Sequence, residues 1–195
     1  MRNTGPFHPT KSYYNEVLPP VTLDVKKANK LLDDAGWKDT DGDDLRDKVI
    51  NGQKTKLTID FYITGSELSR NIALIYQESA AKAGVEINII SKKNSLMKKE
   101  NIKKLKYDMA ALAQGLDSSA DDPYSLWHSD NALAGKTNIS AYNNPQSDVL
   151  IEKIRLTRNI EERKEHYLKP VSYTHLRAHE TKANLVCRLL LEKKK

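Results

Sequence analysis

Three short apolar segments, separated by two helical segments, restrict the fold of this chain more than any other feature. Residues 57–63 alternate apolar and polar side chains, which predicts a half-buried strand, and residues 85–89 repeat the pattern. The third segment, 109–113, is a continuous run of mostly small apolar residues, typical of a strand covered on both faces. A strand–helix–strand–helix–strand order predicts parallel pairing with right-handed crossovers, and therefore an α/β fold.

The two helices between these strands have recognisable ends and an apolar face. The first is predicted to begin after an N-cap at Ser66 and to stop at Gly84, and the second covers residues 94–106. The many lysines of the second helix are most simply its solvated face. The side chains expected to face the core are Leu68, Ile72, Ile75 and Ser79 in the first helix and Met97, Ile102 and Leu105 in the second.

Another helix, ended by a glycine, precedes the first strand. Apolar residues recur at helical spacing over residues 25–35, Asp24 suits an N-cap, and Gly36 supplies the left-handed residue that ends the helix. Trp37 follows directly and needs a core to pack against. Residues 1–22 are rich in proline, glycine, asparagine and tyrosine, which predicts an extended loop.

The part of the chain after the third strand is first irregular and then helical. Residues 114–143 show little periodicity and are predicted to form a long loop. An asparagine followed by a proline at the first helical position opens the next helix, and a capping box opens the last one. The two predicted helices are residues 145–157, capped by Asn144, and Ile160–Leu168, with a capping box of Asn159 and Glu162.

The last residues do not resemble ordinary protein sequence. Residues 171–181 and 185–193 match a translated sequencing adapter, with a variable index between them, and the reading frame fits without a gap. We therefore expect the genuine chain to end near Lys169 and residues 170–195 to form no native domain. The histidine pair His175 and His179, which would suggest a metal site, is discounted for the same reason.

The charge of the chain changes once this tail is set aside. The whole sequence carries a net charge of +6, but six basic and two acidic residues lie from Pro170 onward, which leaves about +2 for the rest. A nucleic-acid partner is therefore not indicated. Cys187, the single cysteine, also lies in the tail, and a cysteine-free chain is compatible with an oxidising compartment. No signal peptide or membrane-spanning segment is visible, and we expect the true N-terminus to lie outside this fragment.

The best candidate for a functional segment is the acidic and aromatic stretch 115–129. It follows the carboxyl end of the third strand, where open α/β sheets usually place ligand sites. It contains two aromatic residues, Tyr124 and Trp127, and one histidine, His128, which we interpret as a partly exposed structural residue. Its acidic residues are Asp117, Asp121 and Asp122. The alternative interpretation is that these acids cap turns and that Trp127 belongs to the core.

Two further segments carry polar residues of interest. Asn138 and Tyr142 are suited to hydrogen bonding with a ligand backbone, although a structural loop leading to the next helix is the simpler explanation. Residues 39–43 begin like a calcium loop, but Asp44 replaces the glycine and Ile50 replaces the bidentate acid, so a standard EF-hand is rejected. A solvated acidic turn is the simpler interpretation. It precedes a hairpin signal at Asn51-Gly52.

Three segments together resemble a known family. KKANKLLDDAGWKDTDGDDLRDK (26–48), DDPYSLWHS (121–129) and NISAYNNPQSDVLIEKIR (138–155), in this order, resemble the family 5 solute-binding proteins. These are the oligopeptide, dipeptide and nickel receptors of ABC importers. The resemblance implies that residues 1–169 form part of one lobe of a two-lobe fold like that of periplasmic binding proteins, with a mostly parallel sheet flanked by helices.

The resemblance also implies a function without catalysis or cofactor. A monomeric receptor captures a small peptide by closure of its lobes and delivers it to the permease subunits of an importer. It works in the periplasm or outside the membrane, where anchoring as a lipoprotein is compatible with the family. In the family, one aspartate of the loop pairs with the amino terminus of the peptide, which suggests Asp117 first and Asp121 second. The predicted ligand-binding residues are Asp117, Asp121, Trp127, Asn138 and Tyr142.

Other functions remain open from the sequence. A receptor for a nickel chelate or a sugar would have the same scaffold, because the fold does not fix the ligand. A small α/β enzyme would use Asp117, Asp121 and His128 as acid–base groups, but no catalytic or metal-binding motif supports it. A third alternative is a calcium-responsive interaction module built on residues 39–43.

Overall fold

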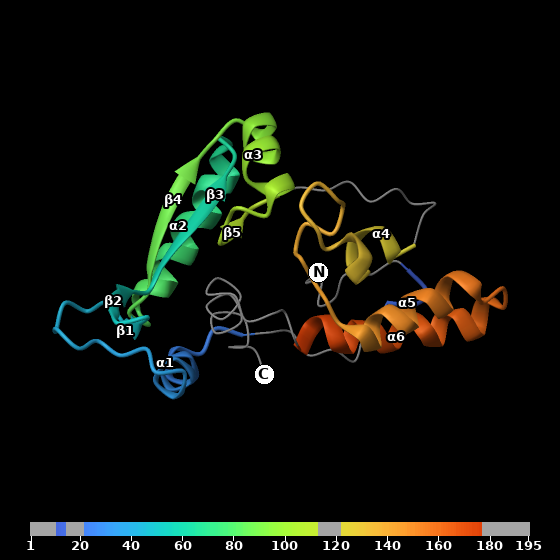
Figure 1. Ribbon diagram of the computed structural model, residues 1–195, viewed down its shortest axis with the longest axis horizontal. Coiled ribbons are helices and arrows are strands. Elements are labelled where there is room, and N and C mark those ends of the chain that lie inside the picture. The colour runs from blue at the N-terminus through green and yellow to red at the C-terminus, as the bar shows by residue number, and fades with distance from the viewer. Residues whose placement is uncertain (1–10, 15–21, 113–121, 177–195) are drawn as a thin grey trace. The chain divides into compact units, whose positions relative to one another are not determined.

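The computed structural model divides the chain into two compact units, which we describe separately (Figure 1). The residues that the structure describes are 11–14, 22–112 and 122–176. Within these, the first unit contains residues 11–14, 100–106 and 122–176, and the second contains residues 22–99 and 107–112. No helix in these described ranges is long and apolar enough to cross a membrane.

The second unit is built on a three-stranded parallel sheet. Strand β3 (Thr58–Ile63) lies in the middle, between β4 (Glu86–Ser91) and β5 (Met109–Ala110). Phe61 of β3 pairs with Ile89 on one side and with Met109 on the other. The predicted parallel α/β arrangement is confirmed. The last strand is shorter than predicted, and the final residue of the predicted segment, Ala113, lies outside the described residues.

Helix α2 (Glu67–Ala81) packs against β3 and β4, but not through the face that the sequence suggests. Its N-cap is Ser66, as predicted. The predicted inward face is wrong, because Leu68 and Ile75 are 71% and 65% exposed. The helix buries two alanines instead, Ala73 and Ala80. Small side chains allow the helix to approach the sheet closely, and the partly buried Tyr76 meets Phe61 of β3 edge-on.

The core of the second unit also receives α1 (Val25–Asp34) and the tryptophan behind it. Asp24 accepts a hydrogen bond from the Lys27 amide at 2.9 Å, and Gly36 has a φ of +82°, so both predicted ends are confirmed. Trp37 is buried in the core, as expected. Lys48 lies beside it and donates to the carbonyl of Ala35 at the end of α1, at 2.7 Å.

A hairpin and a broken helix complete the second unit and lead into the first. Strands β1 (Asp47–Ile50) and β2 (Gln53–Lys56) pair in antiparallel fashion, and both turn residues, Asn51 and Gly52, have positive φ, as the hairpin signal predicts. The single helix predicted over residues 94–106 is wrong. It divides into α3 (Asn94–Glu100) and a 3₁₀ turn, η1 (Ile102–Lys104).

A local hydrogen bond explains this break. The Asn101 side-chain amide donates to the carbonyl of Lys106 at 2.9 Å, and Leu105 adopts a left-handed conformation with a φ of +52°. The side chain thus competes with the regular helical pattern. Met97 and Ile102 are buried as predicted, whereas Leu105 is only half-buried.

The first unit consists mainly of helices, and α5 packs along α6 (Figure 1). Besides η1, its elements are α4 (Tyr124–Trp127), the 3₁₀ turn η2 (Ser129–Asn131), α5 (Pro145–Leu156) and α6 (Ile160–Leu176). The predicted caps are confirmed, because Asn144 accepts from two amides of α5 and Asn159 from two of α6. Helix α6 continues eight residues beyond the predicted end at Leu168.

Candidate functional site

One face of α5 holds the second half of the predicted functional segment 115–129. Asp148 accepts hydrogen bonds from the amide and the hydroxyl of Ser129, at 3.0 and 2.6 Å. Arg155 lies two turns further along the helix. Its Nε is 3.1 Å from a carboxylate oxygen of Asp122, and its guanidinium lies 4.4 Å from the ring centre of Tyr124. The start of η2 and the start of α4 are therefore both tied to α5.

His128 lies between these two anchors and is buried, which corrects the expected partial exposure. Its ring stacks on Tyr124 at 4.2 Å between centroids. Its Nδ1 accepts a hydrogen bond from the Asp130 amide at 3.2 Å. The Tyr124 hydroxyl donates to the Asp130 carboxylate at 2.9 Å, and this bond raises the pKa of Tyr124. The ring pair is thus fixed from both sides.

Asn138 has no exposed surface and uses its whole side-chain amide within the chain. Its Nδ2 donates to the carbonyls of His128 and Tyr142, at 3.1 and 2.8 Å. Its Oδ1 accepts from the Ser140 hydroxyl and the Tyr142 amide, at 2.9 and 3.2 Å. An amide has two donor hydrogens and an acceptor oxygen with two lone pairs, so none is left over. This geometry supports the structural interpretation of Asn138, and its contact with a ligand stays a prediction.

The aromatic candidates differ in how accessible they are. Tyr142 is buried, which raises the pKa of its hydroxyl, and that hydroxyl lies 2.6 Å from the Ser147 hydroxyl. Trp127 is half-buried and meets the Tyr142 ring edge-on at 6.0 Å. Trp127 therefore retains surface that a ligand can contact, whereas Tyr142 offers little.

The predicted acidic residues divide between described and undescribed parts of the chain. Asp117 and Asp121 lie outside the described residues, so their role stays a prediction, and so does the enzyme alternative that needs them near His128. Asp122 is described and exposed. One of its carboxylate oxygens accepts from the Tyr124 amide at 3.0 Å, and the other pairs with Arg155. For Asp122, the interpretation as a turn-capping acid fits this geometry.

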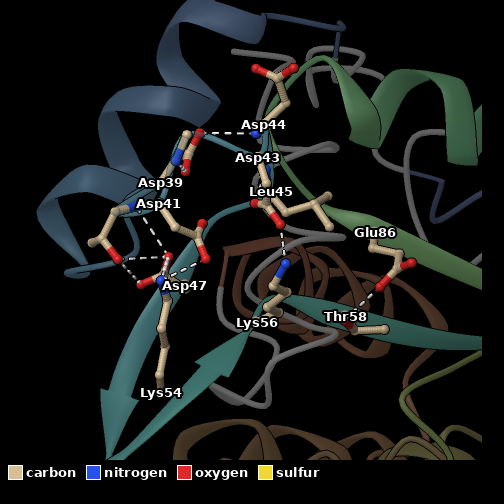
Figure 2. A network of polar contacts seen from close by, with 12 residues as sticks. Asp39, Asp41, Asp43, Asp44, Leu45, Asp47, Lys54, Lys56, Thr58 and Glu86 are labelled. Carbon is tan, nitrogen blue, oxygen red and sulfur yellow. Dashed lines mark hydrogen bonds and ion pairs between the residues drawn. The ribbon is translucent and has the colours of Figure 1, made fainter.

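The acidic loop before the hairpin forms a separate network with two lysines of β2 (Figure 2). Lys54 lies 2.7 Å from a carboxylate oxygen of Asp41, and Lys56 pairs with Asp43. Asp39 is different, because its carboxylate accepts from the amides of Gly42 and Asp44, at 2.7 and 3.0 Å. Carboxylate oxygens of Asp39, Asp41 and Asp43 lie within 4.8 Å of one another. Because lysine ammonium groups already neutralise two of these acids, the arrangement favours a structural role.

Asp47 is the buried acid of this network. Burial tends to raise the pKa of its carboxyl, but hydrogen bonds from Thr40 and Lys54 outweigh this and hold the pKa below its usual value. The bond to Lys56 lowers the pKa of Asp43 in the same way, and the pKa of each lysine is raised in return. The ion pairs of Lys54 and Lys56 therefore connect the acidic loop to β2 of the hairpin (Figure 2).

Arg46 is an important residue that the sequence analysis misses. Its guanidinium donates to the carbonyls of Ala83 and Trp37, at 2.9 and 2.6 Å, and pairs with Asp33 at 2.6 Å. It lines an open depression of about 610 Å³ between α1 and the end of α2. A β-carbon at Gly84 would lie 2.9 Å from Cγ of Arg46. The sequence around Arg46 shows only a charged turn, so no local signal marks this residue.

The fold alone shows which class of solved structures this chain is similar to. The structure of the oligopeptide-binding protein AppA from Bacillus subtilis, in complex with a nonapeptide, matches with a TM-score of 0.75 at 21% identity. The match covers 93% of this chain and 34% of that one. The chain therefore has the fold of part of a periplasmic-type binding protein.

The sequence comparisons give the family. The model described as "Bacterial extracellular solute-binding proteins, family 5 Middle" matches residues 2–135. The chain belongs to this family. It is 30% identical to the oligopeptide-binding protein AppA of Bacillus subtilis (strain 168) over 150 residues, which are 76% of this chain and 26% of AppA. It is 35% identical to the nickel-binding periplasmic protein of Escherichia coli (strain K12) over 89 residues, 46% of this chain and 16% of that protein. The chain thus spans about a quarter of the length of AppA.

Proposed function

We propose that this chain is part of the substrate-binding component of an ABC importer for di- and oligopeptides. The observation that carries the proposal is the family match over residues 2–135, supported by the similarity to an oligopeptide-binding protein over 150 residues. The receptor closes two lobes around the peptide and delivers it to a membrane permease. It binds and releases its substrate without changing it chemically.

The proposed ligand site includes the segment around Asp117 and Asp121. The amino terminus of a peptide loses its hydration when the lobes close, and this is costly unless a carboxylate and hydrogen bonds replace the water. Asp117 is the first choice for this carboxylate and Asp121 the second. Trp127 retains exposed surface nearby in sequence and would form part of the wall, while Asn138 and Tyr142 would act mainly by holding the loop.

The proposed place of action is outside the cytoplasmic membrane, in the periplasm or on a lipid anchor. The family name supports this, since it describes extracellular proteins of bacteria. Permease subunits are the proposed protein partner, and the receptor would act as a monomer.

A receptor for a nickel chelate is the second candidate. Its support is the 35% identity to the nickel-binding periplasmic protein of Escherichia coli, although that match covers 89 residues only. Of the histidines in the described residues, His128 is buried against Tyr124, His166 lies on α6, and His175 falls in the stretch that we expect to be adapter-derived. For this candidate we propose a nickel ion that arrives with its own chelating ligand.

Calorimetry on the complete receptor distinguishes these candidates. The reading frame that contains this chain is expressed whole, and mixed di- to pentapeptides, a nickel–histidine chelate and an oligosaccharide are titrated separately. We expect saturable binding of peptides with a Kd of about 1 μM, which corresponds to about −8 kcal/mol, and no heat from the other two. Saturable binding of the chelate or the sugar without peptide binding would reject the proposal.

The role of the loop aspartate is tested with the same receptor. Asp117→Asn should weaken binding of a free peptide about tenfold or more and have little effect on an N-acetylated peptide, because only the free peptide carries the ammonium. Asp44→Asn, on the exposed loop before the hairpin, is the matched control and should leave affinity unchanged. If acetylation changes the affinity of the wild type and of Asp117→Asn by the same factor, Asp117 does not receive the amino terminus, and Asp121→Asn is the next variant.

A further inference from the structure

Three polar residues on one face of α5 contact the segment 122–129 in reverse order. Asp148, Glu152 and Arg155 are spaced i, i+4 and i+7, which places them in one row along the helix. Arg155 meets Asp122 and Tyr124, and Asp148 meets Ser129. Glu152 lies between them, and its Oε1 is 3.5 Å from Nε2 of His128. The segment therefore runs antiparallel to α5, with a side-chain contact at each turn.

The contact made by Nδ1 of His128 determines which ring nitrogen carries the hydrogen. Nδ1 accepts the hydrogen of the Asp130 amide, so in the neutral ring the hydrogen must be on Nε2. Nε2 is inaccessible to solvent and has no hydrogen-bond partner among the described residues. A buried donor without an acceptor is costly, and such donors are rare in proteins. The nearest carboxylate in the described structure is that of Glu152.

Glu152 is able to satisfy this donor by a small movement. Its side chain is 58% exposed, whereas the His128 ring is buried and stacks on Tyr124. We propose that Glu152 is a positioning residue, which accepts the Nε2 hydrogen of His128 and, with Asp148 and Arg155, sets the position of α4. This inference rests on the proposed function in one respect, since α4 ends at Trp127, a predicted ligand residue.

The consequence for binding follows from the contacts of Trp127. Its ring meets Tyr142 edge-on, and its neighbour His128 is fixed to α5 by the proposed bond. A shift of His128 would move the end of α4 and with it the exposed part of the Trp127 ring. Small displacements of a ligand-contacting group reduce affinity even where the fold is intact.

The test on the full chain is a nitrogen-15 NMR measurement of the histidine side chains. We expect His128 to carry its hydrogen on Nε2 and to exchange it slowly with water. Glu152→Ala should accelerate this exchange at least tenfold, and Glu152→Gln should restore slow exchange because its amide oxygen is also an acceptor. Lys153→Ala, one residue along α5 and exposed, is the control and should behave as the wild type. A hydrogen on Nδ1, or exchange unaffected by Glu152→Ala, overturns the proposal.

The same variants in the complete receptor test the link to binding. We expect Glu152→Ala to weaken peptide affinity about tenfold, which is about 1.4 kcal/mol, and Glu152→Gln to restore it. Unchanged affinity in a receptor that binds peptide overturns the positioning role. If the wild-type receptor binds no peptide, the proposed function is rejected. The NMR result then shows separately whether Glu152 accepts the Nε2 hydrogen of His128. If Glu152→Ala does not fold, the tautomer of His128 in the wild type and the exchange rate in Glu152→Gln still show whether Glu152 accepts the Nε2 hydrogen.

Discussion

At the scale of single residues, Arg46 connects parts of the chain that are distant in sequence. Its guanidinium joins the end of α2, the turn at Trp37 and Asp33 of α1, and its backbone pairs with Gly84 and Leu57. The partners of the guanidinium are carbonyl and carboxylate oxygens, and its several donors reach them together, which a single ammonium group does less well. Arg46 therefore holds α1 onto the sheet.

Arg46→Lys should lower the free energy of unfolding by about 2–3 kcal/mol, since partners buried around the guanidinium lose their donors. Urea unfolding followed by circular dichroism measures this change. Arg70→Lys, at an exposed position of α2, is the matched control and should change stability by less than about 0.5 kcal/mol. Equal effects of the two substitutions would show that Arg46 does not connect α1 to the sheet.

The network of Asp43 and Asp47 makes stability depend on pH in the acid range. Both carboxyls have a folded-state pKa below the ordinary value of 3.8, so their stabilisation is present above that pH and is lost as the pH falls through the folded pKa. We expect Asp47→Asn to be less stable than the wild type near about pH 7 and similar to it near about pH 2. Urea midpoints measured across this range check the prediction, and a constant difference at all pH values would contradict it.

At the scale of elements, most helices and strands and their ends can be predicted from neighbouring residues in the sequence. The way in which these elements pack against one another cannot be predicted in this way. The caps at Asp24, Ser66 and Asn144 and the turn at Asn51-Gly52 are recognisable because each residue acts on its own neighbours. The inward face of α2 is not recognisable, because the closeness of helix and sheet decides it. The apolar periodicity identifies the helix correctly and its buried side wrongly.

Substitutions on the two faces of α2 test which face is buried. Ile75→Gln, on the exposed face, should change the free energy of unfolding by less than about 0.5 kcal/mol. Ala80→Leu, on the buried face, should lower it by about 1–3 kcal/mol, because the sheet leaves no room for the larger side chain. Thermal and urea unfolding of both variants gives the comparison. A larger loss from Ile75→Gln than from Ala80→Leu would restore the face that the sequence suggests.

In the candidate site, too, the sequence predicts the segment but not its contacts. Its segment is recognisable from sequence, because aromatic and acidic residues follow the end of a strand. The row of Asp148, Glu152 and Arg155 is not recognisable, since ordinary solvated helix faces carry the same residue types at the same spacing. The burial of His128 depends on Tyr124 and on α5 together, and the sequence alone gives no sign of that contact.

At the scale of the whole molecule, this chain spans only a part of the proposed receptor. The chain covers about a quarter of AppA in sequence and a third of it in structure. Closure of two lobes buries a peptide only if both walls are present, so we expect neither unit of this chain to bind a peptide tightly by itself. Residues 1–169 as part of one lobe, and residues 170–195 as adapter-derived sequence, remain predictions of the sequence.

The most direct test compares the complete receptor with the 195-residue chain in calorimetric titrations with the same pentapeptide. We expect saturable heat with a Kd of about 1 μM for the complete receptor and no measurable binding for the chain alone. Tight binding by the chain alone, or none by the complete receptor, would contradict the claim that this chain forms one wall of a peptide-binding cleft.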